Sequence, residues 1–129
     1  MIGKVLKSKF DNDANLYDLM RGRIFPQIAP QTTERPFAVY DIISVRAIGS
    51  KDADSHIDEV NVTITFLAEK YSIAHQCAEA SRSALVRMRE DIDKVNVQTC
   101  MFDNQSEAYN VDEQTYAVDV DFVFRVIKD

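Results

Sequence analysis

The chain has 129 residues, of which 46% are apolar, and it carries a formal net charge of −6. This length suits one domain, residues 1–129, and the apolar content is that of a globular protein rather than a disordered one. The acidic balance and the absence of a Lys/Arg cluster argue against tight non-specific binding of nucleic acid. No apolar run approaches the roughly 20 residues that span a membrane, and the N-terminus has no continuous apolar stretch like that of a secretory signal. We therefore expect no membrane partner and a protein of the cytoplasm, or of a particle assembled there.

The N-terminal region predicts two helical segments. Its apolar residues recur at i, i+3, i+4 and i+8 with lysines off that stripe, as in an amphipathic helix. Asp13 is a good N-cap for a short second helical turn, and Gly22 is placed to end it. The apolar stripe of the first helix consists of Ile2, Val5, Leu6 and Phe10.

A proline-punctuated window follows. Residues 23–26 predict a brief strand, and residues 27–36 predict a loop. The only three prolines of the chain are Pro26, Pro30 and Pro36. Each fixes φ, removes a backbone donor and pushes the preceding residue toward extended geometry. The window therefore predicts a stiff, extended connector whose backbone cannot all join a sheet.

Two strands and a polar excursion are predicted next. Residues 37–45 are almost continuously apolar, which predicts a strand that is buried on both faces or central in a sheet. Residues 46–58 are polar and aperiodic, as in an exposed loop or the tip of a long hairpin. Residues 60–67 alternate between apolar and polar side chains and predict a half-buried strand.

The second half predicts one long helix and two strands. Residues 71–91 have helical periodicity, and residues 95–102 predict a strand. Residues 103–110 are polar and predict a turn before the last strand, 116–126, whose alternation is the cleanest in the chain. The apolar stripe of the predicted helix is formed by Ile73, Cys77, Ala80, Ala84, Leu85 and Met88.

This order of elements predicts an α+β fold, with a mainly antiparallel or mixed β-sheet packed on one face by two helices. One face of the sheet is apolar. The other face must meet water or a polar partner, because it carries Asn61, Thr63, Thr65, Asp119 and Asp121.

No metal site or cofactor site is expected. Asp52, Asp54 and Asp58 lie close together, but a calcium loop counted from Asp52 needs an oxygen ligand and then a glycine where His56 and Ile57 stand. The chain's two histidines and two cysteines lack the paired spacings typical of zinc sites. Both cysteines fall in half-buried segments and are expected to be free thiols: Cys77 and Cys100.

No convincing active site is present either. Asp119 and Asp121 share one face of a strand, as paired acid and base carboxylates might, but such pairs are common on solvent faces. Neither His56 nor His75 lies near a nucleophile elbow, and the isolated glycines form no phosphate-binding loop. The sequence therefore favours a structural or binding role over catalysis.

Several motifs together resemble the tail terminator, or tail completion, proteins of long-tailed bacteriophages. Residues 16–26, LYDLMRGRIFP, look like that family's helix end, glycine turn and arginine-hydrophobic-proline strand. Residues 29–31 and 35–40 resemble its loop and proline-aromatic strand entry, and residues 64–71 resemble its strand and acidic turn before an alanine-rich helix. The last strand, 116–126, is similar to its alternating terminal strand.

The resemblance implies an α+β subunit that forms a homohexameric ring. Such a ring stops growth of the tail tube, contacts the tail tube protein and the head-completion or neck protein, and lets genomic DNA pass without specific binding. The implied location is the head-proximal end of the virion tail, after assembly in the host cytoplasm. The residues that we expect to serve the ring or its axial contacts are Gly49, Lys51, Asp52, Asp54, His56, Asp119 and Asp121.

Two other classes of function stay open on the sequence. One is a small α+β protein-binding module that acts on a host or phage protein. The other is a small enzyme with an acidic site, which predicts a discrete pocket around Asp119, Asp121 or His56.

Overall fold

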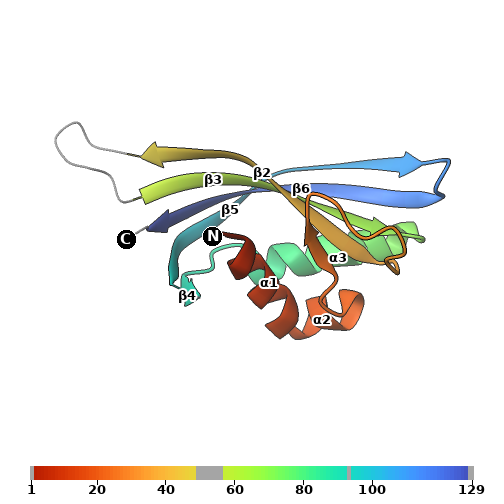
Figure 1. The fold of residues 1–129 in the computed structure, drawn as a ribbon, viewed down its shortest axis with the longest axis horizontal. Helices are drawn as coiled ribbons and strands as arrows, with labels where there is room; N and C mark the ends of the chain where they lie inside the picture. The colour runs from red at the N-terminus through yellow and green to blue at the C-terminus, as the bar shows by residue number, and fades with distance from the viewer. Residues whose placement is uncertain (1, 49–56, 93, 128–129) are drawn as a thin grey trace.

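The computed structural model describes residues 2–48, 57–92 and 94–127. The described residues form six strands, which make one sheet, and three helices. The predicted α+β class is therefore confirmed (Figure 1). The helices are α1 (Ile2–Asn12), α2 (Ala14–Met20) and α3 (Tyr71–Leu85). The strands are β1 (Ile24–Pro26), β2 (Phe37–Ile48), β3 (Ile57–Ala68), β4 (Glu90–Ile92), β5 (Val95–Asn110) and β6 (Thr115–Ile127).

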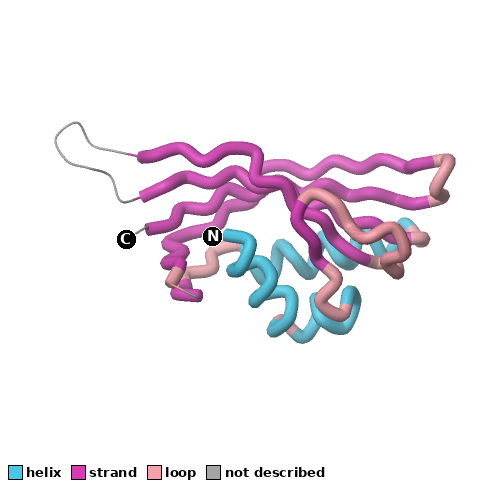
Figure 2. The backbone as a smooth tube through the Cα atoms, in the orientation of Figure 1, coloured by secondary structure: helices cyan, strands magenta, loops and turns pink. Residues whose placement is uncertain are grey.

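The sheet has the order β1-β2-β3-β6-β5-β4. The short β1 pairs with β2 in parallel, and every other neighbouring pair is antiparallel. All three helices lie on one side of the sheet, which leaves the other side uncovered by any described helix (Figure 2). The sheet is thus mixed and covered on one face as predicted, with three helices in place of two.

The hydrophobic core lies between the sheet and the helices. The predicted stripe of α1 is buried, and the ring of Phe10 stacks on that of Phe66 in β3 with centroids 6.2 Å apart. Alternate residues of β3 and β6 fill the sheet side of this core, because successive side chains of a strand point to opposite faces. The largest fully buried side chains are Phe10, Phe66, Phe122, Phe124, Leu6, Leu16, Met20, Ile64 and Leu85. No described helix is long and apolar enough to cross a membrane.

Asp13 caps the start of the second helix as predicted, whereas the C-cap is Arg21, one residue before the predicted Gly22. The Asp13 carboxylate accepts hydrogen bonds from the backbone N–H groups of Asn15 and Leu16, both at 3.1 Å. The helix ends at Met20; its C-cap, Arg21, is in the left-handed conformation with φ 53°, and Gly22 follows with φ 77°. Glycine adopts positive φ at no steric cost, so Gly22 completes the turn into β1 that the left-handed Arg21 begins.

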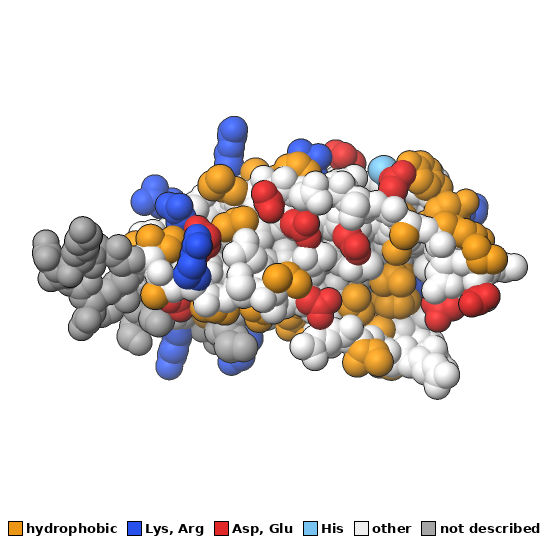
Figure 3. All heavy atoms as spheres, turned by 90° about the horizontal axis from the view of Figure 1, so that it is seen from above, with side chains coloured by type: hydrophobic (Ala, Val, Ile, Leu, Met, Phe, Trp, Pro, Cys, Tyr) orange, Lys and Arg blue, Asp and Glu red, His pale blue; other side chains and the backbone are white. Residues whose placement is uncertain are grey.

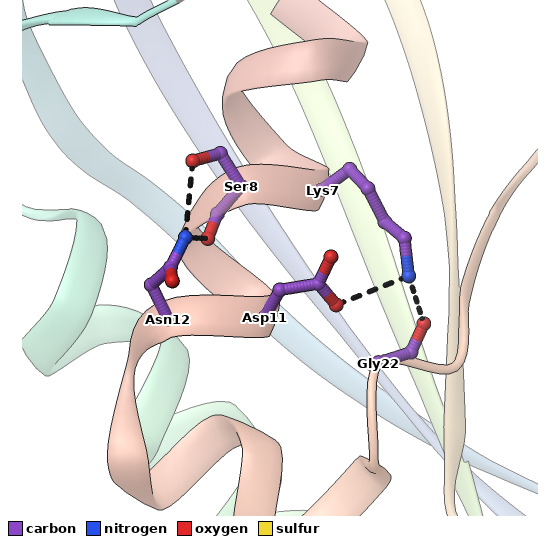
Figure 4. Close-up of polar contacts among 5 residues, drawn as sticks. All are labelled: Lys7, Ser8, Asp11, Asn12 and Gly22. Atoms are coloured by element: carbon purple, nitrogen blue, oxygen red, sulfur yellow. Dashed lines mark hydrogen bonds and ion pairs between the residues drawn. The ribbon is translucent and has the colours of Figure 1, made fainter.

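A lysine of α1 holds this turn. Lys7 Nζ donates to the carbonyl oxygen of Gly22 at 2.7 Å and forms an ion pair with Asp11 Oδ1 at 3.1 Å (Figure 4). Further along the same helix, Asn12 Nδ2 donates to the carbonyl oxygen of Ser8 at 2.8 Å. The lysines outside the apolar stripe of α1 therefore include one that joins the helix to the start of the sheet.

The predicted helix over 71–91 is wrong in its last part. Helix α3 ends at Leu85, and Arg87 has a left-handed φ of 66°. The N–H of Arg87 donates to the carbonyl of Cys100 in β5, so the chain joins the sheet edge and continues into β4. Met88 is still buried, which is why its spacing imitated a further helical turn.

The predicted turn over 103–110 is also wrong. These residues continue β5 and pair with β6 as far as Asn110 and Thr115, and the turn occupies only residues 111–114. Residues 103–110 are polar because most of them are exposed on both faces of the β5–β6 hairpin. Their composition alone therefore predicted a loop.

Strand β2 also departs from the prediction. It runs to Ile48, three residues beyond the predicted end, and its second half is exposed, with Ile43 at 64% and Val45 at 57%. The expectation of burial on both faces therefore fails there. The paired ends of β2 and β3, at Ile48 and Ile57, and the β5–β6 turn lie at opposite ends of the sheet (Figure 1).

Candidate interaction surfaces

The side of the sheet away from the helices, called here the outer face, carries rows of short polar side chains. Register brings Asp41, Thr63, Asp121 and Asn104 into one row across four strands. The neighbouring row contains Val39, Thr65, Asp119 and Ser106. Figure 3 shows this face, with acidic side chains along its centre.

Hydrogen bonds hold the two predicted aspartates of this face. Thr65 Oγ1 donates to Asp119 Oδ1 and Thr63 Oγ1 donates to Asp121 Oδ1, both at 2.6 Å. Asn104 Nδ2 approaches the second oxygen of Asp121 at 3.5 Å. The two carboxylates therefore act as acceptors that tie β6 to its neighbours, and they stand side by side as the sequence predicted.

An ion-pair network lies at one end of the outer face. Glu59, whose side chain is 15% exposed, contacts Arg46 Nη2 at 2.7 Å and Arg125 Nη2 at 3.7 Å. These three residues come from β3, β2 and β6. The outer face thus changes from acidic at its centre to basic near the end of the β2–β3 hairpin (Figure 3).

The proline loop borders a groove of about 820 Å³ at the other end of β2. Its apolar floor consists of Phe37, Val39 and Leu67, which belong to the outer face. Arg35 anchors the loop: it donates to the carbonyl oxygen of Glu113 at 3.0 Å and to the Thr115 hydroxyl. The groove therefore has a wall fixed to the β5–β6 turn.

A second cluster fastens the β5–β6 hairpin to helix α3. Glu107 accepts a hydrogen bond from Tyr71 at 2.9 Å and contacts His75 Nε2 at 2.6 Å. The hydrogen bond with His75, followed by that from Tyr71, lowers the pKa of Glu107 from its ordinary value. The bond to Glu107 in turn raises the pKa of Tyr71. The ring of Tyr116 packs against those of Tyr71 and Tyr109, so the hairpin has a defined position on the helix.

The other predicted site residues lie outside the described part of the chain: Gly49, Lys51, Asp52, Asp54 and His56. Within the described ranges, no group of three or more His, Cys, Asp or Glu side chains could hold a metal ion. Both cysteines are buried and free, as expected. Burial raises the thiol pKa to about 11 at Cys77 and to about 12 at Cys100.

Sequence reasoning missed the Arg46–Glu59–Arg125 network and the contact between His75 and Glu107. Both join residues that are far apart in the chain, and only the strand register brings them together. Opposite charges at matching ends of predicted neighbouring strands were the one available signal for the first. The contact between His75 and Glu107 could be predicted only if β5 was known to extend to Asn110, because Glu107 lies in the part of β5 that was predicted to be a turn.

Comparison with known proteins decides the family. The family described as "Tail completion protein gp17" matches residues 5–127, nearly the whole chain. The chain belongs to this family. The resemblance noted from the sequence is therefore confirmed, and it makes the chain a structural protein of the phage tail and thus of the virion.

Solved structures share the fold of this tail completion protein. A chain described as "Virion of native gene transfer agent (GTA) particle" matches with a TM-score of 0.78 and 16% identity, over 93% of this chain and 90% of that one. A second solved chain matches with a TM-score of 0.59 and 13% identity, over 98% of this chain and 96% of that one. No curated protein matches. Membership of the tail completion family favours a structural role over catalysis for the surfaces described above.

Proposed function

We propose that this protein forms a ring of six copies that caps the tail tube, stops its elongation and joins it to the head. The family match over residues 5–127 carries this proposal. The partners are other copies of the chain, the tail tube protein and the head-completion or neck protein. A ring needs a head-to-tail contact that uses two different surfaces of each copy.

Two features of the fold support an assembly role. The paired ends of β2 and β3, at Ile48 and Ile57, lie at one end of the sheet and the β5–β6 turn lies at the other (Figure 1), so one copy can meet different partners at its two ends. The proline-loop groove beside the β5–β6 turn adds a concave apolar surface to one of these ends.

The outer face suits the lining of a bore through which DNA passes. Its centre carries the Asp41, Asp119 and Asp121 carboxylates among short hydroxyl and amide side chains. Each of the six copies has a formal net charge of −6. Such a wall repels phosphates, so the DNA slides without specific binding.

Residues of the 46–58 excursion are proposed to serve the ring or its axial contacts. Deletion of residues 49–55 tests this part by measurement of the oligomer mass and of tail capping. An intact ring that still caps tails after the deletion removes these residues from the proposal and leaves the rest standing.

Removal of the gene from the phage or prophage that encodes this chain tests the function itself. Electron micrographs are expected to show overlong tails without heads, and plasmid-borne wild-type protein is expected to restore tails of uniform length. Head-attached tails of normal length in the deletion strain refute the proposal.

A further inference from the structure

Two edges of the sheet are only partly covered by other strands. On one side, β1 pairs with residues 38–40 of β2 and goes no further. On the other side, β4 pairs with residues 95–97 of β5, and the Arg87 N–H reaches the carbonyl of Cys100. Within the described ranges, no strand pairs with the outer edge of residues 41–48 or with that of residues 101–110.

Backbone groups point outward along the free part of β2. Ala38 donates its N–H to the carbonyl of Arg23, and Tyr40 accepts from the N–H of Gln27. Residues of β2 whose side chains face the helices therefore turn their N–H and C=O toward this edge. The register with β3 continues the same set through Val45 and Ala47.

The same argument applies to β5. The carbonyl of Cys100 accepts from Arg87 at the outer edge, and Cys100 pairs with Phe124 on the helix side of the sheet. The register with β6 continues this set through Phe102, Gln105 and Tyr109. Both free edges thus offer alternating donors and acceptors to a further strand.

The β2 edge lacks two of the usual blocks against strand pairing, because residues 41–48 contain neither proline nor lysine. Each free stretch contains a β-bulge, between Ile42 and Ser44 in β2 and between Phe102 and Asn104 in β5, so a regular ladder forms on either side of these bulges. Residues 41–48 expose the apolar side chains of Ile43 and Val45. The two stretches also differ in charge, because residues 41–48 contain one aspartate and one arginine, whereas residues 101–110 contain Asp103 and Glu107 and no cation.

The directions of the strands suit a repeating contact. β2, β3, β6 and β5 are antiparallel in succession, so β2 and β5 run in opposite directions. A second copy in the same orientation therefore brings its β2 alongside β5 of the first as an antiparallel pair. The free stretches lie at opposite ends of the sheet, which staggers the copies along the strands.

We propose that residues 41–48 of one copy pair with residues 101–110 of the next. This inference rests on the proposed ring and identifies how its copies join: by one sheet that continues from subunit to subunit. Each copy uses two different edges, so the contact is head-to-tail, and it closes into a ring when the strands are inclined to the ring axis, because the stagger between copies is then taken up as the shear of a barrel. The outer faces of all copies then share one side of the sheet.

Crosslinking in assembled tails tests the pairing. Ser44 and Ser106 lie on the outer face of the two edges. Tails that carry Ser44→Cys and Ser106→Cys together are treated with a short bismaleimide, which tolerates a shift of register. Denaturing gels are expected to show a ladder of multiples of 14.7 kDa. Each single variant is the control and is expected to remain at the mass of one copy, because the two native cysteines are buried.

Mixing of the two single variants in one tail separates head-to-tail pairing from pairing of like edges. The mixture is expected to give dimers, since each copy then has one reactive edge. Dimers from a single variant, or capped tails without any crosslinked species from the double variant, overturn the proposed pairing.

Proline variants test the role of the backbone donors. Val45→Pro and Gln105→Pro each remove one outward N–H, and we expect overlong tails from both. Val45→Thr is the matched control, because it keeps the N–H and is expected to cap tails normally. Circular dichroism checks that each variant folds, and if a proline variant does not fold, the crosslinks decide. Uniform, capped tails from folded proline variants overturn the pairing while leaving the ring proposal intact. Normal tails after deletion of the gene refute the proposed function itself.

Discussion

Gly22 offers a direct test of how the turn between α2 and β1 is held. Its φ is 77°, and a Cβ atom at this position would lie 2.6 Å from Asp11 Oδ1 and 3.1 Å from Lys7 Nζ. Alanine at position 22 therefore meets both backbone strain and the Lys7–Asp11 ion pair. The left-handed conformation costs an L-residue about 1–2 kcal/mol. The loss of an exposed ion pair costs about 0.2–1 kcal/mol.

We expect Gly22→Ala to lower the free energy of unfolding by about 2 kcal/mol. In a chain of this length, that loss lowers Tm by roughly 8 °C. Urea denaturation followed by circular dichroism measures the free energy, and calorimetry measures Tm.

Asp11→Ala separates the two causes, because it removes the oxygen that a Cβ at position 22 would strike. In the Asp11→Ala background, Gly22→Ala is expected to cost less than in the wild type, by the steric share of the loss. The backbone share remains in both backgrounds. A loss below about 0.5 kcal/mol for Gly22→Ala in the wild type, the range of an ordinary surface change, refutes the account of this turn.

Three further expectations concern single side chains. Asp13→Ala is expected to cost about 1 kcal/mol in urea denaturation, because it removes the oxygen that caps α2; an unchanged midpoint contradicts the cap. Glu107 has a lowered pKa, so its contact with His75 stabilises the fold fully above the ordinary carboxyl pKa and is lost as pH falls through the lowered value. His75→Ala is expected to raise the Glu107 pKa in an NMR titration, and no change would remove His75 as the cause. Burial raises the thiol pKa of Cys77 and Cys100 to about 11 and about 12, so neither is expected to react with a maleimide at pH 8 until urea unfolds the chain.

Local signals in the sequence predicted much of the fold. The stripe of α1, the Asp13 cap and the alternation in β3 and β6 each depend on neighbouring residues, and each is confirmed. Asp119 and Asp121 were also placed on the polar face of the sheet, because alternation along a strand fixes the face of every residue.

The wrong predictions have a common physical cause. Residues 103–110 and the second half of β2 are strands because they pair with a partner strand, while their side chains are largely exposed. Hydrophobic patterning records burial, so it cannot identify a strand that is stabilised by its backbone pairing. The end of α3 was placed too late for a related reason. Met88 is buried although it lies after the helix, in the segment that joins the edge of β5 through the N–H of Arg87.

Strands β3 and β6 give the molecule a preferred direction of mechanical strength. They pair with each other from Ile57 and Ile127 at one end to Ala68 and Tyr116 at the other. A pull between these ends loads the interstrand hydrogen bonds in shear, because those bonds lie perpendicular to the strands. Many bonds must then break together, whereas a sideways pull opens them one at a time. In the proposed ring, this arrangement resists a pull along the strands without a disulfide, since both cysteines are free.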